Sequence, residues 1–280
     1  MDEEEIRTVE MDLLVEGMRR VHGHDFSEYA VASLRRRLAQ WLGTSGYPTF
    51  GAAIPNVLRD PELCNSLVEG VTVNVSEMFR DPHFFKALRE KVVPHLQTYP
   101  HARVWVAGCA TGEEVYSLAI LLREEGLGDK CRIYATDLNQ DVLARAQQGI
   151  FQLQYMRQYT RNYQKAGGTG EFSDYYAARY DRAIMDPTLM RNVVFAAHNL
   201  VTDSDFSEMQ LILCRNVLIY FKPSLKDRVL NLFDRCLTPG GYLCLGTKEV
   251  LEGRIIGEHY REALPHTRIY RKKYGDPQRI

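Results

Sequence analysis

Apolar positions follow two different patterns along the chain, and the change falls near residue 100. Before it, apolar residues recur at helical spacing, as at Val9, Leu13 and Met18, which predicts helices. After it, short apolar runs alternate with amphipathic stretches, which is typical of a mostly parallel sheet with flanking helices. We therefore predict an α/β protein with a small all-helical N-terminal domain at 1–97 and a Rossmann-like domain at 98–280.

The second region contains the apolar runs of a doubly wound sheet. Strands are expected at 103–108, 131–136, 193–197, 209–214 and 241–247. Connecting helices are expected at 113–125, 139–148 and 224–237. Residues 260–264 and 267–270 flank a Pro-His pair and predict an antiparallel hairpin that closes the sheet.

Residues 150–192 interrupt this alternation of strands and helices. A structureless loop of that length is uncommon in a compact domain, so we predict an inserted small β-subdomain with short helices. The glycine-rich stretch 166–170 is expected to form a hairpin turn, because no strand-loop-helix context for a phosphate cradle surrounds it.

A glycine loop between the first strand and its helix is the strongest sign of ligand binding. Gly108 and Gly112 permit backbone conformations that a Cβ would exclude, and they let a ligand approach the main chain. The next apolar run ends in Asp137, which is placed to bind ribose hydroxyls.

This pattern leaves a dinucleotide and a nucleoside-bearing cofactor such as S-adenosylmethionine (SAM) open. The loop lacks the full dinucleotide fingerprint, and Glu113 and Glu114 open the helix that follows it. Two carboxylates would repel a pyrophosphate but suit the ammonium and ribose groups of SAM. The alternative is an ordinary nucleotide-fold turn whose solvated acids favour the helix dipole.

Composition narrows the class of protein further. The net charge of −1 gives no general attraction to nucleic acid or to an anionic membrane. We expect a cytoplasmic protein without membrane insertion, because the start is acidic and no apolar run could span a bilayer. The six cysteines are scattered without a Cys-x-x-Cys pair, so no metal site is expected.

Two further clusters carry candidate chemistry. The polar stretch from Asn74 through Ser76 to Arg80 precedes a capped helix and is a candidate site loop, or else a plain connector. The run Arg35-Arg36-Arg37 is either a solvated helix face or a local basic spot for an acidic protein partner.

The fourth strand ends at Cys214, and Arg215 and Asn216 follow it. Ligands of open α/β sheets bind at the carboxyl ends of strands, so these residues are candidates for the same site. Tyr220 comes shortly afterwards, and either a hydroxyl in the crevice or core packing would explain it.

These motifs together resemble the CheR-type chemotaxis receptor glutamate O-methyltransferase family, over nearly the whole length. The resemblance includes Asn74-x-Ser76-x-x-x-Arg80, Ala110-Thr111-Gly112-Glu113-Glu114-x-Tyr116-Ser117, Ala135-Thr136-Asp137, Asn199-Leu200 and Cys214-Arg215-Asn216-Val217-x-Ile219-Tyr220-Phe221. It implies methyl transfer from SAM to glutamate side chains on receptor helices, with S-adenosylhomocysteine as product. Ser76 and Met78 depart from the family pattern, where Thr and an aromatic residue are usual.

The glycine loop and the resemblance together assign the site residues. Cofactor binding is implied for Asn74, Ser76, Arg80, Gly108, Glu113, Glu114, Asp137, Asn199, Leu200, Arg215 and Asn216. Arg80 and Tyr220 match the pair that orients the acceptor carboxylate. Since they lie in different predicted domains, catalysis is expected in a cleft between the two.

The resemblance also implies how the acceptor binds. Arg35, Arg36 and Arg37 look like the face that meets acidic receptor helices, and the insertion 150–192 looks like the subdomain that docks a receptor peptide in some members. Another signalling protein as acceptor, or a non-catalytic SAM-binding module, remains an alternative. Arg80, Asp137 and Tyr220 favour catalysis.

Overall fold

The computed structural model describes residues 2–72, 76–203, 206–251 and 258–274. The chain divides into two compact units. The first comprises Met1–Asn74 and Tyr220–Arg228, and the second comprises Val75–Ile219 and Val229–Ile280.

The first unit is helical, as predicted. Its helices are α1 (Glu3–His22), α2 (Val31–Ser45), α3 (Phe50–Val57) and α4 (Pro61–Val71). Side chains at the starts of α1 and α4 accept backbone N–H groups that the helix leaves without partners: Asp2 accepts from Glu5, and Asp60 from Glu62 and Leu63. The core contains Leu14, Met18, Trp41, Phe50 and Leu67.

The short segment Tyr220–Arg228 belongs to this first unit although it comes much later in the chain. The carbonyl of Tyr220 accepts the N–H of Ala30 at 2.8 Å, and the N–H of Lys222 donates to the carbonyl of Glu28 at 2.8 Å. The rings of Tyr29 and Phe221 meet edge to face at 5.2 Å. The residues just after Ile219 are therefore fixed by the helical unit.

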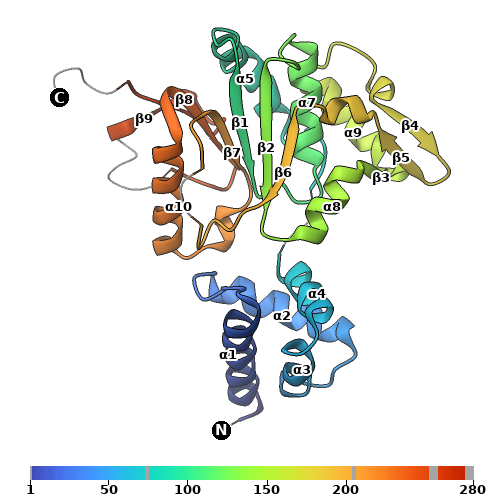
Figure 1. Cartoon of the computed structure of the whole chain (residues 1–280), viewed down its shortest axis with the longest axis vertical. Helices are drawn as coiled ribbons and strands as arrows, with labels where there is room; N and C mark the ends of the chain where they lie inside the picture. The colour runs from blue at the N-terminus through green and yellow to red at the C-terminus, as the bar shows by residue number, and fades with distance from the viewer. Residues whose placement is uncertain (1, 73–75, 204–205, 252–257, 275–280) are drawn as a thin grey trace. The chain divides into compact units, whose positions relative to one another are not determined.

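The second unit is built on a mixed sheet in which the described residues form seven strands. The spatial order is β6-β2-β1-β7-β8-β10-β9, and the first five strands are parallel (Figure 1). The strands are β1 (Ala102–Ala107), β2 (Cys131–Asp137), β6 (Val193–Ala197), β7 (Met209–Cys214), β8 (Leu237–Leu245), β9 (Tyr260–Leu264) and β10 (Ile269–Lys272). This confirms the predicted α/β class and the closing antiparallel hairpin.

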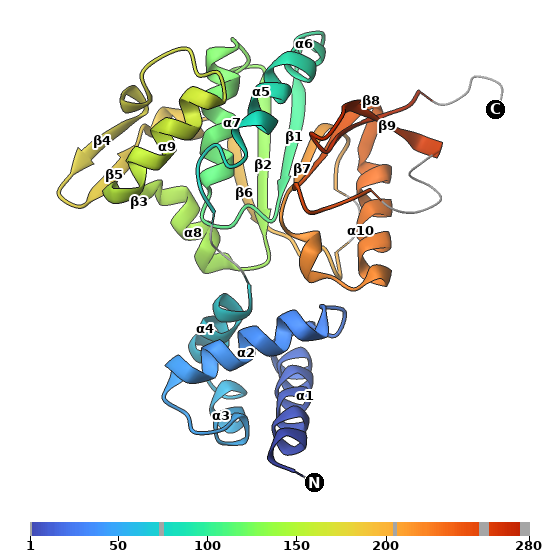
Figure 2. The same cartoon turned by 180° about the vertical axis from the view of Figure 1, so that it is seen from behind.

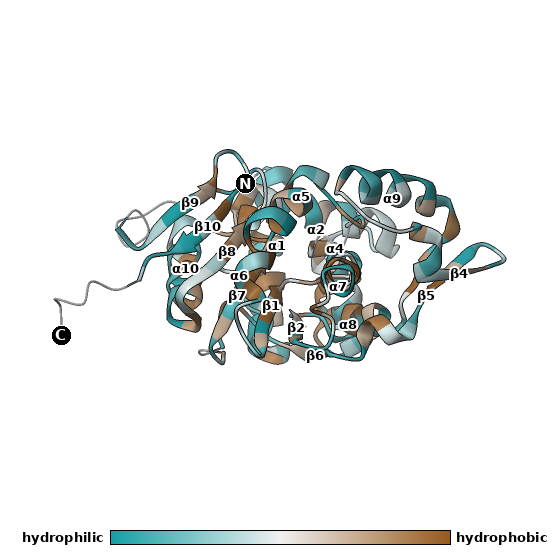
Figure 3. Ribbon diagram, turned by 90° about the horizontal axis from the view of Figure 1, so that it is seen from above, coloured by the Kyte–Doolittle hydropathy of each residue, from teal (hydrophilic) through white to brown (hydrophobic). Residues whose placement is uncertain are grey.

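The helices that complete the αβ layers are α5 (Pro82–Lys91), α6 (Val93–Leu96), α7 (Glu113–Glu124), α8 (Gln140–Gln148) and α10 (Pro223–Cys236). Every residue of the central strand β7 is buried, as expected for a parallel strand covered on both faces. Figure 3 shows apolar colour concentrated on α7 and the central strands. Over the described part of the chain, no helix has the length and apolar character needed to cross a membrane.

The units divide at Asn74 rather than at residue 97, where we expected the domain boundary. Apolar residues of α5 and α6, including Phe84, Phe85 and Leu96, share one core with Val104 of β1. Helical spacing predicts a helix but does not say which core its apolar face will join. The sequence pattern therefore assigns residues 82–96 to the helical domain, although in the structure they pack on the sheet.

The insertion forms a small antiparallel sheet of order β3-β5-β4 beside a longer helix, α9, as Figure 2 shows. Its elements are β3 (Ile150–Gln152), α9 (Leu153–Lys165), η1 (Phe172–Tyr175), β4 (Tyr176–Arg179), β5 (Arg182–Met185) and η2 (Pro187–Met190). This confirms the predicted β-subdomain.

The predicted hairpin turn at 166–170 is wrong. These glycines follow the end of α9, where Gly168 N–H donates to the carbonyl of Tyr163 at 3.0 Å and Gly170 N–H to its hydroxyl at 2.9 Å. The hairpin instead turns between β4 and β5, where Tyr180 has a φ of 53°. Gly167 has a φ of 79° just after the end of α9. A glycine-rich stretch can therefore end a helix as well as form a hairpin turn.

Candidate cofactor-binding site

The parallel strands bring the predicted site residues of the second unit to one edge of the sheet. Gly108 follows the end of β1, Asp137 ends β2, and Asn199 comes shortly after β6. Arg215 directly follows β7, which pairs with β1 in parallel. Residues from four separate parts of the sequence thus gather at the carboxyl edge, where such sheets bind ligands.

Asp137 is held in place by backbone donors. Its Oδ2 accepts the N–H of Ala110 at 3.0 Å, and its Oδ1 accepts the N–H of Asn139 at 3.1 Å. Burial raises the pKa of Asp137 above its usual range, against the lowering effect of these backbone bonds. Each oxygen retains a further lone pair, so the carboxylate fits a pair of ribose hydroxyls.

The loop from Gly108 to Gly112 is closed by its backbone. The N–H of Gly108 and that of Cys109 both donate to the carbonyl of Thr136, at 2.8 and 2.9 Å. Gly108 has a φ of 73°, and a Cβ there would lie 2.5 Å from Cγ2 of Val217. Only glycine avoids both the strained conformation and that clash.

Glu113 and Glu114 differ in their surroundings. Oε2 of Glu113 accepts the hydroxyl of Thr111 at 2.6 Å, so this carboxylate braces the loop. Oε1 of Glu114 is buried without a hydrogen-bond partner among the described residues, and its Oε2 lies 3.6 Å from Nη1 of Arg215. A buried acceptor without a partner is costly, so Glu114 suits the ammonium group of SAM.

The protonation of Glu114 gives a testable pH dependence. Burial raises its pKa above the usual range, while the charges of Arg215 and Arg80 lower it. Protonation removes the charge that attracts an ammonium group, so affinity for SAM is expected to fall as the pH is lowered, and to begin falling above the range in which an ordinary glutamate is protonated. Calorimetry at a series of pH values measures it. Glu114→Gln should bind weakly with a flatter profile, and an unchanged profile in that variant would contradict the assignment.

The loop before α5 is anchored on both sides. The N–H of Phe79 donates to the hydroxyl of Ser117 on α7 at 2.8 Å, and Asn162 of α9 donates to the carbonyl of Met78 at 3.0 Å. Asn74 lies outside the described residues, while Ser76 is partly exposed. The insertion and the glycine-loop helix thus both position this loop.

Arg80 is presented by an unusual backbone. The residues on either side, Phe79 and Asp81, have φ values of 53° and 57°. The half-buried Arg80 therefore lies in a sharply turned segment, and Arg215 holds this segment in place. Nη2 of Arg215 donates to Oδ2 of Asp81 at 2.7 Å and lies 3.4 Å from the carbonyl oxygen of Arg80.

Arg215 is itself almost fully enclosed. Its side chain is 1% exposed, and its guanidinium lies 4.0 Å from the ring centroid of Phe84. The predicted cofactor contact of Arg215 stays a prediction, while the structure shows that it holds the Arg80–Asp81 turn. Sequence reasoning did not include Asp81, because its Asp-Pro pair is also an ordinary helix start.

Asn199 and Leu200 follow β6 in a closed turn. Oδ1 of Asn199 accepts the N–H of Val201 at 2.9 Å, and its N–H donates to Asp203 at 2.8 Å. The preceding residue, His198, donates its N–H to the carbonyl of Asp137 at 3.0 Å. This turn is therefore tied to the residue that we assign to the ribose.

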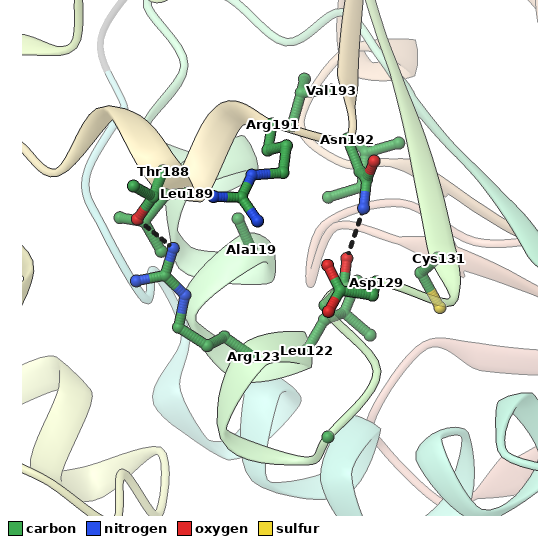
Figure 4. A pocket seen from close by; sticks show the side chains of 13 residues that line it. Ala119, Leu122, Arg123, Asp129, Cys131, Thr188, Leu189, Arg191, Asn192 and Val193 are labelled. Atoms are coloured by element: carbon green, nitrogen blue, oxygen red, sulfur yellow. Dashed lines mark hydrogen bonds between the residues drawn. The ribbon is translucent and has the colours of Figure 1, made fainter.

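A pocket of about 400 Å³ lies at the opposite edge of the sheet, by the first residues of β2 and β6 (Figure 4). None of the predicted cofactor residues lines it. Its Arg123 is already paired with Asp186 at 2.9 Å and Thr188 at 2.7 Å. This pocket is therefore separate from the candidate cofactor site.

Comparisons with known proteins show the family of this chain. The family described as "CheR methyltransferase, SAM binding domain" matches residues 74–262. Cher3 of Pseudomonas putida is 48% identical over 97% of this chain and 100% of that protein. The chemotaxis protein methyltransferase of Listeria monocytogenes is 32% identical over 83% of this chain and 86% of that protein.

Solved structures of methyltransferases are also similar in part. N-methyltransferase NodS of Bradyrhizobium japonicum, in complex with S-adenosyl-L-homocysteine, is 15% identical with a TM-score of 0.39. The match covers 70% of this chain and 89% of that one.

The cofactor follows from the family and from the fit of the residues. Asp137 keeps lone pairs beyond its backbone bonds and Glu114 keeps a buried acceptor without a partner among the described residues, which fits the ribose and ammonium groups that SAM carries. The SAM-binding family model covers the glycine loop, Asp137 and Arg215. The chain belongs to the CheR methyltransferase family, and its cofactor is S-adenosylmethionine.

Proposed function

We propose that this protein is a protein-glutamate O-methyltransferase that acts on a chemoreceptor-type signalling protein. Support comes from the relatives named chemotaxis protein methyltransferase. The observation that carries the choice of a carboxylate acceptor is Arg80. It is a half-buried cation in a segment that Arg215 joins to the acid assigned to the cofactor: Nη2 of Arg215 lies 3.4 Å from the carbonyl oxygen of Arg80, and Nη1 of Arg215 lies 3.6 Å from Oε2 of Glu114.

The chemistry needs little from the protein beyond alignment. A glutamate carboxylate is already ionised and nucleophilic at pH 7, so no general base is required. Bound SAM supplies a methyl group on a sulfonium, and an O–CH₃ ester bond replaces the S–CH₃ bond, leaving S-adenosylhomocysteine. Alignment of oxygen, carbon and sulfur in a line can lower the barrier by about 7–11 kcal/mol.

Arg80 would bind and partly neutralise the acceptor carboxylate. Its loop is fixed by Ser117, Asn162 and Arg215, so the guanidinium is held before the acceptor arrives. We assign Tyr220 the donation of one hydrogen bond to the same carboxylate, an assignment that rests on the family resemblance. Both contacts must leave the attacking lone pair free.

The basic run on α2 is the proposed docking surface for the acidic acceptor. Arg35 and Arg36 are exposed, whereas Arg37 is partly buried and reaches Gln40 at 3.4 Å. Exposed cations attract an acidic helix over a range of about 8–10 Å at ordinary ionic strength. The insertion, with its sheet β3-β5-β4, is a second proposed contact for a receptor peptide.

Reversing the charge at Arg36 and Arg37 tests this surface. Arg36→Glu with Arg37→Glu should raise KM for the protein acceptor and leave the affinity for SAM unchanged, because attraction to an acidic partner becomes repulsion. Steady-state kinetics at several salt concentrations measure both. Lys86→Glu with Lys91→Glu, two exposed positions on α5, is the matched control. Equal kinetics in both double variants would reduce the basic run to a solvated helix face.

Labelled SAM tests the proposed function as a whole. The protein is incubated with the labelled cofactor and with membranes and soluble extract of its own organism, and the labelled protein is identified. A labelled chemoreceptor is the expected result. Label on an unrelated protein would overturn the proposed acceptor, and cofactor binding without any transfer would favour a non-catalytic module.

A further inference from the structure

Glu249 is a buried acid that the sequence motifs did not include. It comes four residues after β8 ends at Leu245, and it is only 3% exposed. Its own N–H donates to the carbonyl of Gly246 at 2.9 Å, which folds the chain back at the carboxyl edge of the sheet. A buried carboxylate needs several donors to be tolerated there.

The carboxylate of Glu249 finds three backbone donors. Oε2 accepts the N–H of Gly246 at 2.6 Å and that of Asn216 at 2.9 Å. Oε1 accepts the N–H of Ile219 at 3.3 Å. One side chain thus joins the turn after β8 to the turn after β7.

The turn after β7 contains a residue in the left-handed conformation. Asn216 has a φ of 63°, in the left-handed region, which asparagine adopts more readily than most residues other than glycine. Gly246 leaves room for it, since a Cβ at Gly246 would lie 2.8 Å from both the backbone N and the Nδ2 of Asn216. The bond from Asn216 to Glu249 therefore fixes a residue in the left-handed conformation at the candidate cofactor site.

The same turn shapes the glycine loop. Val217 follows Asn216, and its Cγ2 lies only 2.5 Å from the position that a Cβ of Gly108 would take. Bonds at both ends of the segment, at Asn216 and Ile219, fix where Val217 lies. A shift of this segment would move the wall against which the loop of Gly108 packs.

We propose that Glu249 is a positioning residue for SAM, acting through Asn216 and Val217. It does not touch the cofactor itself. It fixes the backbone of the β7 turn so that Asn216 and the loop of Gly108 are in place before the cofactor binds. This inference concerns the same site as the proposed function. It rests on the binding of SAM there and does not depend on the acceptor.

The test is cofactor affinity in Glu249→Gln. The amide keeps the shape of the side chain and one accepting oxygen. Its NH₂ group replaces the other accepting oxygen, so that a donor faces a backbone N–H, which is also a donor. The Kd of S-adenosylhomocysteine, measured by calorimetry on the full chain well below its Tm, is expected to rise at least tenfold. The KM for SAM should rise with it, while KM for the acceptor stays unchanged. Glu249→Asp should recover part of the affinity.

Glu171→Gln is the matched control, because it makes the same change at an exposed carboxylate. If Glu249→Gln does not fold, Val217→Ala tests the same link and is expected to raise the Kd severalfold. A lower Tm with unchanged Kd would show that Glu249 only stabilises the turn, and would overturn the proposal. Calorimetry needs no acceptor, so failure of glutamate methylation in the wild type would leave this test intact.

Discussion

Asp137→Ala is expected to weaken the binding of SAM by about tenfold to about a hundredfold. The ribose hydroxyls would lose a charged acceptor, and hydrogen bonds to charged groups contribute about 1.5–3 kcal/mol. The N–H groups of Ala110 and Asn139 would also lose their acceptor, which loosens the glycine loop. Calorimetric titration with SAM and with S-adenosylhomocysteine measures the change.

Asp137→Asn separates the two effects. An amide keeps one accepting oxygen for the backbone but loses the negative charge, so its affinity is expected to fall between the wild type and Asp137→Ala. Asp141→Asn, at an exposed acid in the first turn of α8, is the control. Wild-type affinity in Asp137→Ala would remove this residue from the site.

Arg80→Ala is expected to cut methyl transfer by more than tenfold, which corresponds to at least about 1.4 kcal/mol of transition-state stabilisation. The variant loses the cation that would orient the acceptor carboxylate. The loop backbone should persist, because its anchors at Phe79 and Met78 use main-chain groups. Initial rates with labelled SAM measure the effect, and Arg80→Lys should recover part of the activity by keeping the charge.

Tyr220→Phe is the companion variant in the other unit. It keeps the ring and deletes one hydroxyl, so turnover should fall with little change in cofactor affinity. The carbonyl of Tyr220 would still accept the N–H of Ala30, and the local fold should remain. Full activity with a lower Tm would show that the hydroxyl serves packing, and would contradict its catalytic assignment.

The sheet could be predicted because its signals are local. Each parallel strand is a short apolar run between turn residues, and the predicted runs match β1, β2, β6 and β7 to within one residue at either end. Strand β8 begins at Leu237, earlier than expected, because Leu237 pairs with Met209 before an irregularity in which Gly240 has a φ of 81°, and the pairing resumes between Tyr242 and Leu211. The carboxyl-edge site followed from strand order alone.

The supports of the site could not be predicted in the same way. Arg215 meets Asp81, and Glu249 meets Asn216 and Ile219, across 30 residues or more of sequence, so no spacing reveals these contacts. The sequence identified Arg215 by its place after a strand, but only the structure shows its bond to Asp81 and its packing on Phe84. A turn held by one distant carboxylate leaves no local pattern.

The insertion shows the same limit from another side. Its helix α9 carries its buried positions at Met156, Tyr159 and Tyr163, a helical spacing hidden by the polar composition around it. The hydroxyl of Tyr163 and the guanidinium of Arg89 both bond the carboxylate of Glu124 on α7. The insertion is thus joined to α7, the helix that follows the glycine loop, through the carboxylate of Glu124, which the sequence analysis did not identify.

The most direct test of the account is the chemical nature of the transferred methyl group. A purified chemoreceptor signalling domain from the same organism is incubated with the protein and labelled SAM, digested, and mapped by mass spectrometry, with alkali treatment of a parallel sample. The account predicts a methyl group on glutamate side chains, released by alkali as methanol, and less than a tenth as much in the same reaction time with Arg80→Ala. A methyl group that survives alkali, or one on lysine or arginine, would contradict it.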